Sequence, residues 1–173
     1  TVDPGLTLKK ARQLFVVFAY SDADWAGYLD SSRSTTGYAI SLGPNLVSWQ
    51  SNKQPTISKS SIEAEYHTIA YTVTDTFWIH YVPAELHIFL RSPMQVLYDN
   101  LSSSYIAANP VLHNRSKHIK VDHHFVHEWV SHGNLLIRYV PTQFQLANLF
   151  IKSLPVNRFL FLESNLSVDP PFR

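Results

Sequence analysis

The order of patterned segments in this chain predicts a single mixed α/β domain, in which helices cover a β-sheet. Three observations lead to this prediction. The chain opens with strand-like segments and then alternates between helical and strand-like patterns. Hydrophobic residues make up 45% of its 173 residues, which is enough for one good core. Charged residues make up only 16%, which excludes extensive disorder outside the ends.

The first part of the chain predicts three strands. Residues 14–20 are apolar at both parities, which is typical of a central strand covered on both faces. Residues 37–42 and 46–49 predict two more strands, joined by a turn at Gly43-Pro44-Asn45. Residues 6–9 are compatible with a further short strand or with a simple lead-in.

A long helix is predicted over residues 60–87, where apolar side chains recur at helical spacing. Ser58 or Ser60 is available as its N-cap. Pro83 lies inside this pattern and has no backbone N–H, so the helix should kink or break near Val82.

The rest of the chain continues the alternation. Its predicted elements are a strand at residues 94–98, a short helix that Asn100 or Ser102 can cap and that runs to Ala108, a helix at 119–131 that ends near Gly133, and a strand at 135–140. After Pro141, a capping box of Thr142 and Gln145 predicts another helix. The tail after Pro155 is expected to be partly helical and then loose.

Composition limits the classes of partner. The net charge is +1, so a nucleic acid would have to be held by local basic clusters. Two clusters occur, although ordinary solvated charge explains them equally well: Lys9, Lys10 and Arg12, and Arg115, Lys117 and Lys120. The absence of cysteine excludes disulfides and thiolate metal sites. No apolar run approaches the roughly 20 residues of a membrane span, so no membrane partner is expected.

Acidic side chains follow two of the predicted strands. Asp22 and Asp24 come just after the first apolar strand and, two positions apart in extended backbone, point to the same side. Asp99 follows the strand at residues 94–98 in the same way. Carboxylates in this arrangement suit a divalent cation, although aspartate also favours turns and helix caps.

The first turn of the long helix adds Glu63 and Glu65, and helical phase does not choose between them. Either can lean toward a site at the sheet edge, and both also fit ordinary acids favoured by the helix dipole. Two strands ending in aspartate, together with a glutamate at this helix, form a more specific combination. A two-metal phosphodiesterase site needs several carboxylates around ions about 4 Å apart.

Histidines offer a competing interpretation. His123 and His127 are four residues apart on a predicted helix and can bind zinc together. No third ligand has a matching spacing, and no His-Glu-x-x-His pattern exists. Surface and half-buried histidines are the simpler explanation for the group, whose other members are His113, His118 and His124.

A series of short motifs then follows a recognisable order. The motifs are Tyr20-Ser21-Asp22-Ala23-Asp24-Trp25-Ala26-Gly27, Ser34-Thr35-Thr36-Gly37-Tyr38, Lys53-Gln54-Pro55-Thr56-Ile57-Ser58, Glu63-Ala64-Glu65-Tyr66, Asp99-Asn100-Leu101-Ser102, Ala107-Ala108-Asn109-Pro110, Lys117-His118-Ile119, Asp122-His123-His124-Phe125 and Arg138-Tyr139-Val140-Pro141-Thr142. Together they closely resemble the ribonuclease H domain of copia-type LTR-retrotransposon Pol polyproteins. The resemblance extends from about Gly5 to Val168.

The resemblance implies a ribonuclease H-like fold, with a five-stranded mixed sheet flanked by helices and its first three strands antiparallel. It implies a lead-in from an upstream reverse transcriptase region at residues 1–13, the ribonuclease H-like domain at 14–155 and a C-terminal tail at 156–173. The chain lacks an initial methionine, so we expect a piece of a longer protein. The implied activity is cleavage of the RNA strand of RNA–DNA hybrids during reverse transcription, in cytoplasmic virus-like particles.

Carried over motif by motif, the catalytic residues would be Asp22, Glu65, Asp99 and Asn148, and the three acids would hold metal. Glu65 is preferred to Glu63 because its Glu-Tyr pair matches the family motif. Asn148 stands where the family has aspartate, so it keeps a carbonyl oxygen but loses a charge.

The expected mechanism uses two Mg²⁺ ions, or Mn²⁺ in their place, bridged by Asp22. One ion would activate a water and the other would stabilise the leaving 3′-oxygen. Hybrid recognition would rest on backbone shape and RNA 2′-hydroxyls. Phosphate contacts are expected from Arg115, Lys117 and Lys120.

Departures from the family pattern support a second hypothesis, a catalytically dead relic or structural domain of a reverse transcriptase polyprotein. They include Asn148, Pro83, and Ile151-Lys152-Ser153 in place of the usual Thr-Lys-Pro. A dead site should show no saturable Mg²⁺ binding that depends on Asp22. The zinc interpretation instead predicts metal retained after all three acids are mutated.

Overall fold

A computed structural model describes residues 5–6, 8–10, 16–28, 30–90, 92–100, 117–166 and 168–169. The predicted helix that follows Asp99 lies outside the described residues, as does Arg115. Lys117 and Lys120 are described as parts of a helix, but their side chains are not. The three predicted phosphate contacts therefore stay predictions.

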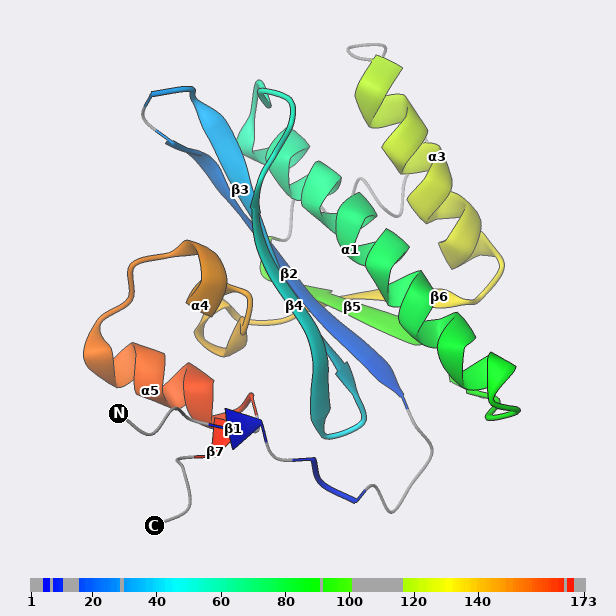
Figure 1. Ribbon diagram of the computed structural model, residues 1–173. Helices are drawn as coiled ribbons and strands as arrows, with labels where there is room; N and C mark the ends of the chain where they lie inside the picture. Colours follow the sequence, from blue (N-terminus) through cyan, green and yellow to red (C-terminus); the bar gives the residue numbers. More distant parts are fainter. Residues whose placement is uncertain are drawn as a thin grey trace.

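Five strands form the central sheet. They are β2 (Val17–Tyr28), β3 (Arg33–Leu42), β4 (Asn45–Lys53), β5 (Met94–Tyr98) and β6 (Leu135–Tyr139), in the spatial order β4-β3-β2-β5-β6 (Figure 1). The pairs β2–β3 and β3–β4 are antiparallel, whereas β2–β5 and β5–β6 are parallel. The five-stranded mixed sheet with three antiparallel strands at its start is thus confirmed.

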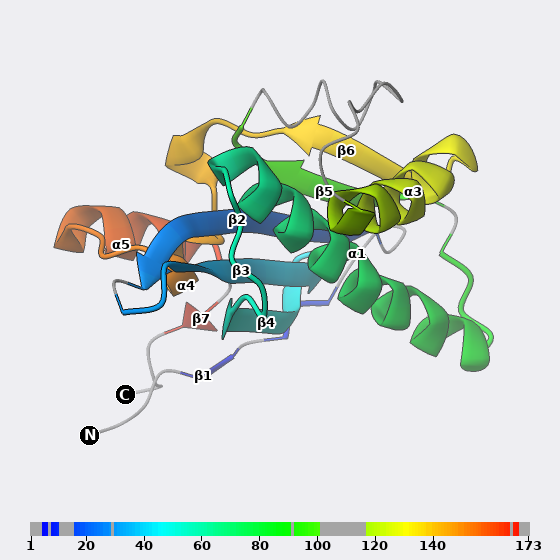
Figure 2. The same ribbon diagram turned by 90° about the horizontal axis from the view of Figure 1, so that it is seen from above.

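Helices cover both faces of this sheet. α1 (Ser61–Glu85) and α3 (Lys117–Ser131) lie on one face, and α4 (Asn148–Ile151) and α5 (Val156–Ser164) lie on the other (Figures 1 and 2). Alternate residues of β2 serve the two faces: Val17 and Ala19 pack in the core under α1, and Tyr20 packs in the core under α4 and α5. This two-sided burial explains why the strand is apolar at both parities.

β2 is longer than the sequence predicted. Its parallel pairing with β5 runs from Phe18 only to Tyr20, but its antiparallel pairing with β3 continues to Tyr28. The prediction that the strand ends before Asp22 was therefore wrong. Beyond Tyr20 the strand turns polar although Ser21 and Asp22 are still buried, because these residues line the pocket described below and not the apolar core.

α1 begins as predicted, with the Ser60 hydroxyl accepting from the Glu63 N–H at 3.2 Å. The predicted break near Val82 was wrong, since the helix continues through Pro83 and ends at Glu85. A proline in the last turn removes only one helical hydrogen bond. Its carbonyl also helps to end the helix, because it accepts from the N–H groups of Leu86 and Ile88.

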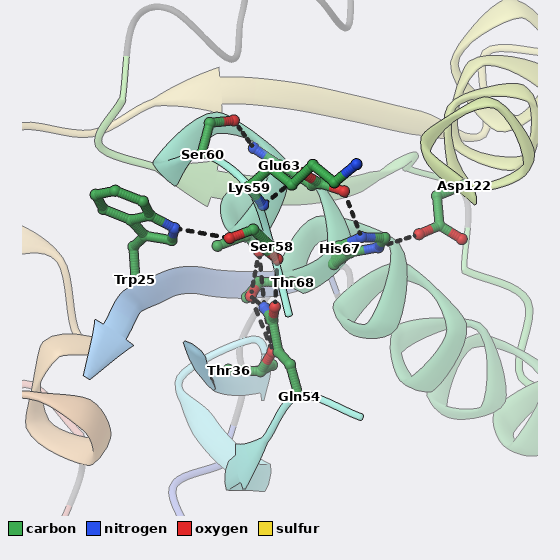
Figure 3. Close-up of polar contacts among 11 residues, drawn as sticks. Trp25, Thr36, Gln54, Ser58, Lys59, Ser60, Glu63, His67, Thr68 and Asp122 are labelled. Atoms are coloured by element: carbon green, nitrogen blue, oxygen red, sulfur yellow. Dashed lines mark hydrogen bonds and ion pairs between the residues drawn. The ribbon is translucent and has the colours of Figure 1, made fainter. Parts of the chain in front are cut away.

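A buried amide joins the start of α1 to the sheet (Figure 3). The Nε2 of Gln54 donates to the Ala64 carbonyl at 2.8 Å and to the hydroxyls of Thr36 and Thr68, both at 3.1 Å. Its Oε1 accepts from the Ser58 hydroxyl at 3.0 Å. Because every polar atom of this side chain has a partner, the network fixes the first turns of α1 against β3.

Smaller features complete the fold. Gly43 and Gly133 take positive φ angles of 58° and 73°, which allow the predicted β3–β4 turn and the predicted end of α3. β1 (Gly5–Leu6) pairs antiparallel with β7 (Val168–Asp169). None of the helices in the described part of the chain is both long and apolar enough to cross a membrane. The three-part division of the chain stays a prediction.

A partly buried ion pair links α1 to α3. His67 is only 7% exposed, and its Nδ1 lies 2.6 Å from the Asp122 carboxylate, as Figure 3 shows. Its Nε2 lies 3.8 Å from the Glu63 carboxylate in the same helix. The hydrogen bond to Asp122 raises the pKa of His67, against the opposing effect of burial, and both carboxylates add to the increase.

This pair predicts a pH-dependent stability. Because the folded-state pKa of His67 is raised, its contribution should be complete below the unfolded value of about 6.5 and lost as pH rises through the folded value. Asp122→Asn should lower the free energy of unfolding in urea by about 1–3 kcal/mol at pH 5.5 and by clearly less at pH 9. Replacing the exposed His124 by Gln is the control and should show no such trend. A deficit of Asp122→Asn that stays constant with pH would contradict the assignment.

Candidate metal and active site

A small pocket lies where β2 and β5 stop pairing. Its lining consists of Ser21, Asp22, Glu65, Ile69, Tyr98 and Asp99. Three elements contribute an acid to it: β2 gives Asp22, α1 gives Glu65, and the residue after β5 is Asp99. The carboxyl ends of parallel strands are the usual ligand-binding edge of an α/β sheet. The structure thus brings together the three acids that the sequence predicted as a set.

Asp22 is the most buried of these acids, with 5% of its surface exposed. One carboxylate oxygen accepts from the Ala23 N–H at 2.9 Å, and the other lies 2.5 Å from the Nζ of Lys152. Burial raises the pKa of Asp22 to about 6; the Lys152 ammonium opposes the increase, and the negative charge of Asp99 adds to it. Such a carboxylate needs a cation beside it to remain ionised at neutral pH.

The two glutamates of α1 take different positions. Glu65 lines the pocket, and its Oε1 accepts from the side-chain amide of Asn100 at 2.7 Å. Glu63 instead accepts from the Lys59 N–H at 2.7 Å, where it closes the first turn of the helix. Geometry therefore separates two residues that helical phase alone left equivalent.

Asp24 does not line the pocket. β2 and β3 lose their regular register between Asp24 and Tyr28, and the Asp24 carboxylate lies against Gly27, where an added Cβ would come within 2.1 Å of it. Asp24 therefore belongs to this irregular end of β2, and only Asp22 of the two neighbouring acids reaches the pocket.

Gln145 has a role that its sequence pattern did not indicate. The predicted capping box was wrong: residues 142–144 form one turn of 3-10 helix, and α4 begins later, at Asn148. The Gln145 side chain is fully buried, and its Nε2 donates to the carbonyls of Ser21 at 3.0 Å and Leu97 at 3.3 Å. These carbonyls lie where the β2–β5 ladder ends, so the amide bridges the two strands at that point.

Asn148 opens α4 and is 2% exposed. Its Nδ2 donates weakly to the Thr142 carbonyl at 3.4 Å. Within the described residues, its Oδ1 is buried and accepts no hydrogen bond. An unsatisfied buried acceptor is costly, and a bound cation or water is a natural partner for it.

Lys152 lies at the site, although the sequence pointed to it only as part of the departure Ile151-Lys152-Ser153 and not as a site residue. α4 packs against β2 and β3, and Gly37, the cross-strand partner of Asp22, permits the close approach. A Cβ on Gly37 would come within 2.5 Å of the Ile151 side chain and 3.2 Å of the Ala147 carbonyl. This contact brings Lys152, at the end of α4, to Asp22.

The donor set fits a hard divalent cation, which prefers carboxylate and amide oxygens. Three carboxylates line one pocket, and the Oδ1 of Asn148 lacks a partner among the described residues. In the present side-chain positions, the described residues contain no group of three histidine, aspartate or glutamate side chains that is close enough to hold a metal ion. Asp22 instead contacts Lys152, and Glu65 contacts Asn100, so these side chains would have to exchange partners to bind metal.

The zinc interpretation gains nothing from the described residues. His124 is exposed on α3, and His127 is half-buried on the same helix. The side chains of His113, His118 and His123 lie outside the description. A zinc site among the histidines therefore stays a prediction.

Comparison with known sequences finds long relatives. The chain is 44% identical over 161 residues to the "Retrovirus-related Pol polyprotein from transposon RE2" of Arabidopsis thaliana, an alignment that covers 93% of the chain and 11% of the relative. The chain therefore spans about a tenth of the length of the curated relatives it matches. No protein-family model matches it.

Comparison with solved structures finds the same fold at low identity. The N-terminal RNase H domain of Rv2228c from Mycobacterium tuberculosis superposes with a TM-score of 0.57 at 10% identity, covering 87% of this chain and 97% of that one. LC11-RNase H1, solved in complex with an RNA/DNA hybrid, gives a TM-score of 0.52 at 14% identity, covering 75% and 88%. These likenesses establish a ribonuclease H-like fold.

The buried amide at position 145 yields a stability prediction. Gln145→Ala removes both hydrogen bonds to the ends of β2 and β5, and it should lower the free energy of unfolding by roughly 2–4 kcal/mol. Gln143→Ala is the matched control, since Gln143 is exposed two residues earlier, and it should cost less than about 0.5 kcal/mol. Urea unfolding measures both. Equal losses for the two variants would show that Gln145 does not hold the strands.

Proposed function

The chain belongs to the retrovirus-related Pol polyproteins of copia-type transposons, as a ribonuclease H-like domain, and on that premise we propose that it is a divalent-metal-dependent nuclease. Its substrate would be the RNA strand of an RNA–DNA hybrid. The observation that carries the proposal is the convergence of Asp22, Glu65 and Asp99 on one pocket at the carboxyl ends of β2 and β5. A zinc site among the histidines would not require this convergence. Neither would acids that serve only in turns or as helix caps.

In the proposed mechanism, the three carboxylates bind and orient the metal, for which Mg²⁺ is the expected ion. Bound Mg²⁺ supplies charge neutralisation at the scissile phosphate and a water of lowered pKa. Asp22 is the central ligand, because it is the most buried acid and its carboxylate gains most from a compensating cation. Asn148 would add a neutral oxygen, which is a weaker ligand than a carboxylate.

Two comparisons support the proposed substrate and partner. LC11-RNase H1 has this fold and was solved with an RNA/DNA hybrid bound. The relatives are Pol polyproteins of which this chain matches about a tenth, so an upstream reverse transcriptase domain is the proposed partner. We propose that Arg115, Lys117 and Lys120 contact the hybrid backbone, in virus-like particles in the cytoplasm.

A specific observation favours a second candidate, a non-catalytic domain of the same polyprotein. Asn148 carries no charge, and the ammonium of Lys152 forms an ion pair with the carboxylate of Asp22. Both features weaken a site whose task is to concentrate cations. Activity and metal binding, measured separately, distinguish a slow enzyme from a dead one.

The deciding experiment is cleavage of a labelled RNA–DNA hybrid by the purified chain in Mg²⁺. We expect slow cleavage that Asp22→Asn abolishes and that Asn148→Asp increases by about tenfold or more, because it restores a charged ligand. Asp30→Asn, an exposed turn residue, is the control and should leave the rate unchanged. If folded wild-type protein and Asn148→Asp are both inactive, the non-catalytic domain is the correct assignment.

The different positions of the two glutamates give a further test. Glu65→Gln should lower the cleavage rate by about 100-fold and weaken Mg²⁺ binding, because the pocket loses a charged ligand. Glu63→Gln should leave cleavage nearly unchanged and lower the free energy of unfolding by roughly 0.5–2 kcal/mol, because it alters a helix cap and the ion pair with His67 but not the pocket. The reverse pattern would assign the metal ligand to Glu63.

A further inference from the structure

Lys152 and Asp22 form an unequal pair. The Nζ of Lys152 lies 2.5 Å from a carboxylate oxygen of Asp22, although 130 residues separate them in sequence. The Asp22 side chain is 4% exposed, whereas the Lys152 side chain is 37% exposed. The carboxylate is therefore fixed inside the pocket wall, and the lysine reaches it from the surface.

The backbone of Lys152 is anchored, but its side chain has room to move. Its N–H donates to the Asn148 carbonyl at 3.1 Å, and the preceding residue, Ile151, packs against Gly37. Beyond Cα, a lysine has a flexible four-carbon stem that ends in a compact charge. The ammonium can thus leave Asp22 without any change in α4.

The oxygen that accepts from Lys152 belongs to the most buried pocket acid. Within the described residues, Lys152 is the sole cation at ion-pair distance from Asp22. Without it, the carboxylate would be buried with no opposite charge, which is strongly unfavourable. A divalent cation needs the same oxygen at about 2.0–2.1 Å and would be repelled by an ammonium in that place.

We propose that Lys152 is a built-in competitor for the metal: its ammonium neutralises Asp22 in the metal-free protein and leaves that carboxylate when a divalent cation binds. This inference rests on the proposed metal site and adds a determinant of its affinity. Lys152 sets the metal concentration at which the site fills, and it keeps the empty site from holding an uncompensated buried charge.

The test is calorimetric titration of Mg²⁺ into the purified wild-type chain, Lys152→Met, Lys53→Met and Asp22→Asn. Lys152→Met should bind Mg²⁺ about tenfold or more tightly than wild type, because one competing positive charge is gone. Lys53→Met removes the same charge from an exposed lysine that stacks on the Tyr28 ring, and its affinity should match wild type. Asp22→Asn should abolish the binding and so identify the site.

Thermal unfolding supplies a second readout. In EDTA, Lys152→Met should melt below wild type, because Asp22 is left without a counter-ion. Saturating Mg²⁺ should close that gap, since the metal replaces the lost ammonium. A lysine that only supports the fold would predict a gap that Mg²⁺ does not change, together with an unchanged affinity.

Acetylation of wild-type lysines, followed by peptide mass spectrometry, tests the movement directly. Lys152 should react more slowly than Lys53 without metal and should react faster once Mg²⁺ is added, whereas Lys53 should not change.

The possible outcomes separate the inference from the function on which it rests. Equal, Asp22-dependent affinity in wild type and Lys152→Met would overturn the competitor role and leave the metal site standing. Constant reactivity of Lys152 while calorimetry shows the site filled would do the same. Binding by Lys152→Met alone would support the competitor role in its strongest form. An absence of saturable binding in both proteins would overturn the metal site and the inference together.

Discussion

The candidate site depends on the point at which the neighbouring strands β2 and β5 stop pairing and diverge. β2 and β5 pair in parallel only as far as Tyr20 and Leu97, after which β2 continues along β3 alone. The small pocket lies where the two strands diverge. The buried amide of Gln145 donates to a carbonyl of each strand, Ser21 and Leu97, and so fixes the two sides of the opening relative to each other. Asp22 and Asp99 occupy the two sides of this opening, and their positions follow from it.

α1 brings the third acid to this opening, and its start is tightly fixed. The Ser60 cap and Glu63 satisfy backbone groups of the first turn, and Gln54 ties the next residues to β3. Farther along, His67 joins the helix to α3. Glu65 thus projects from a segment with little freedom, as is needed for a ligand held in one geometry.

Charge balance governs the other side of the opening. Gly37 lets α4 approach the sheet closely enough for Lys152 to reach Asp22, a buried carboxylate that favours ionisation only beside a cation. On the same short helix, Asn148 holds a buried oxygen without a hydrogen bond among the described residues. The short helix α4 and the residue that follows it therefore carry one unsatisfied acceptor and one cation that pairs with Asp22.

Local patterns in the sequence determined much of this protein. The two-sided apolar run of β2, the serine cap of α1 and the glycines at positions 43 and 133 were readable because each depends on residues close along the chain. The order of motifs also predicted the fold and the set of three acids. Only the tertiary structure separated Glu65 from Glu63, since the two differ in what surrounds them and not in helical phase.

The local sequence did not indicate which distant segments are in contact. Gln145 matched a capping box locally, but its side-chain amide instead donates to carbonyls of two strands, which lie 124 and 48 residues earlier in the chain. Lys152 lies in the segment that replaces the family's Thr-Lys-Pro, but nothing local linked it to Asp22, which lies 130 residues earlier. The sequence by itself determined which acids could form a site, and the packing of α4 against the sheet decided which cation faces them. Packing decides which cation pairs with Asp22, because a buried carboxylate without an opposite charge is unfavourable, and burial depends on tertiary structure and not on position in the chain.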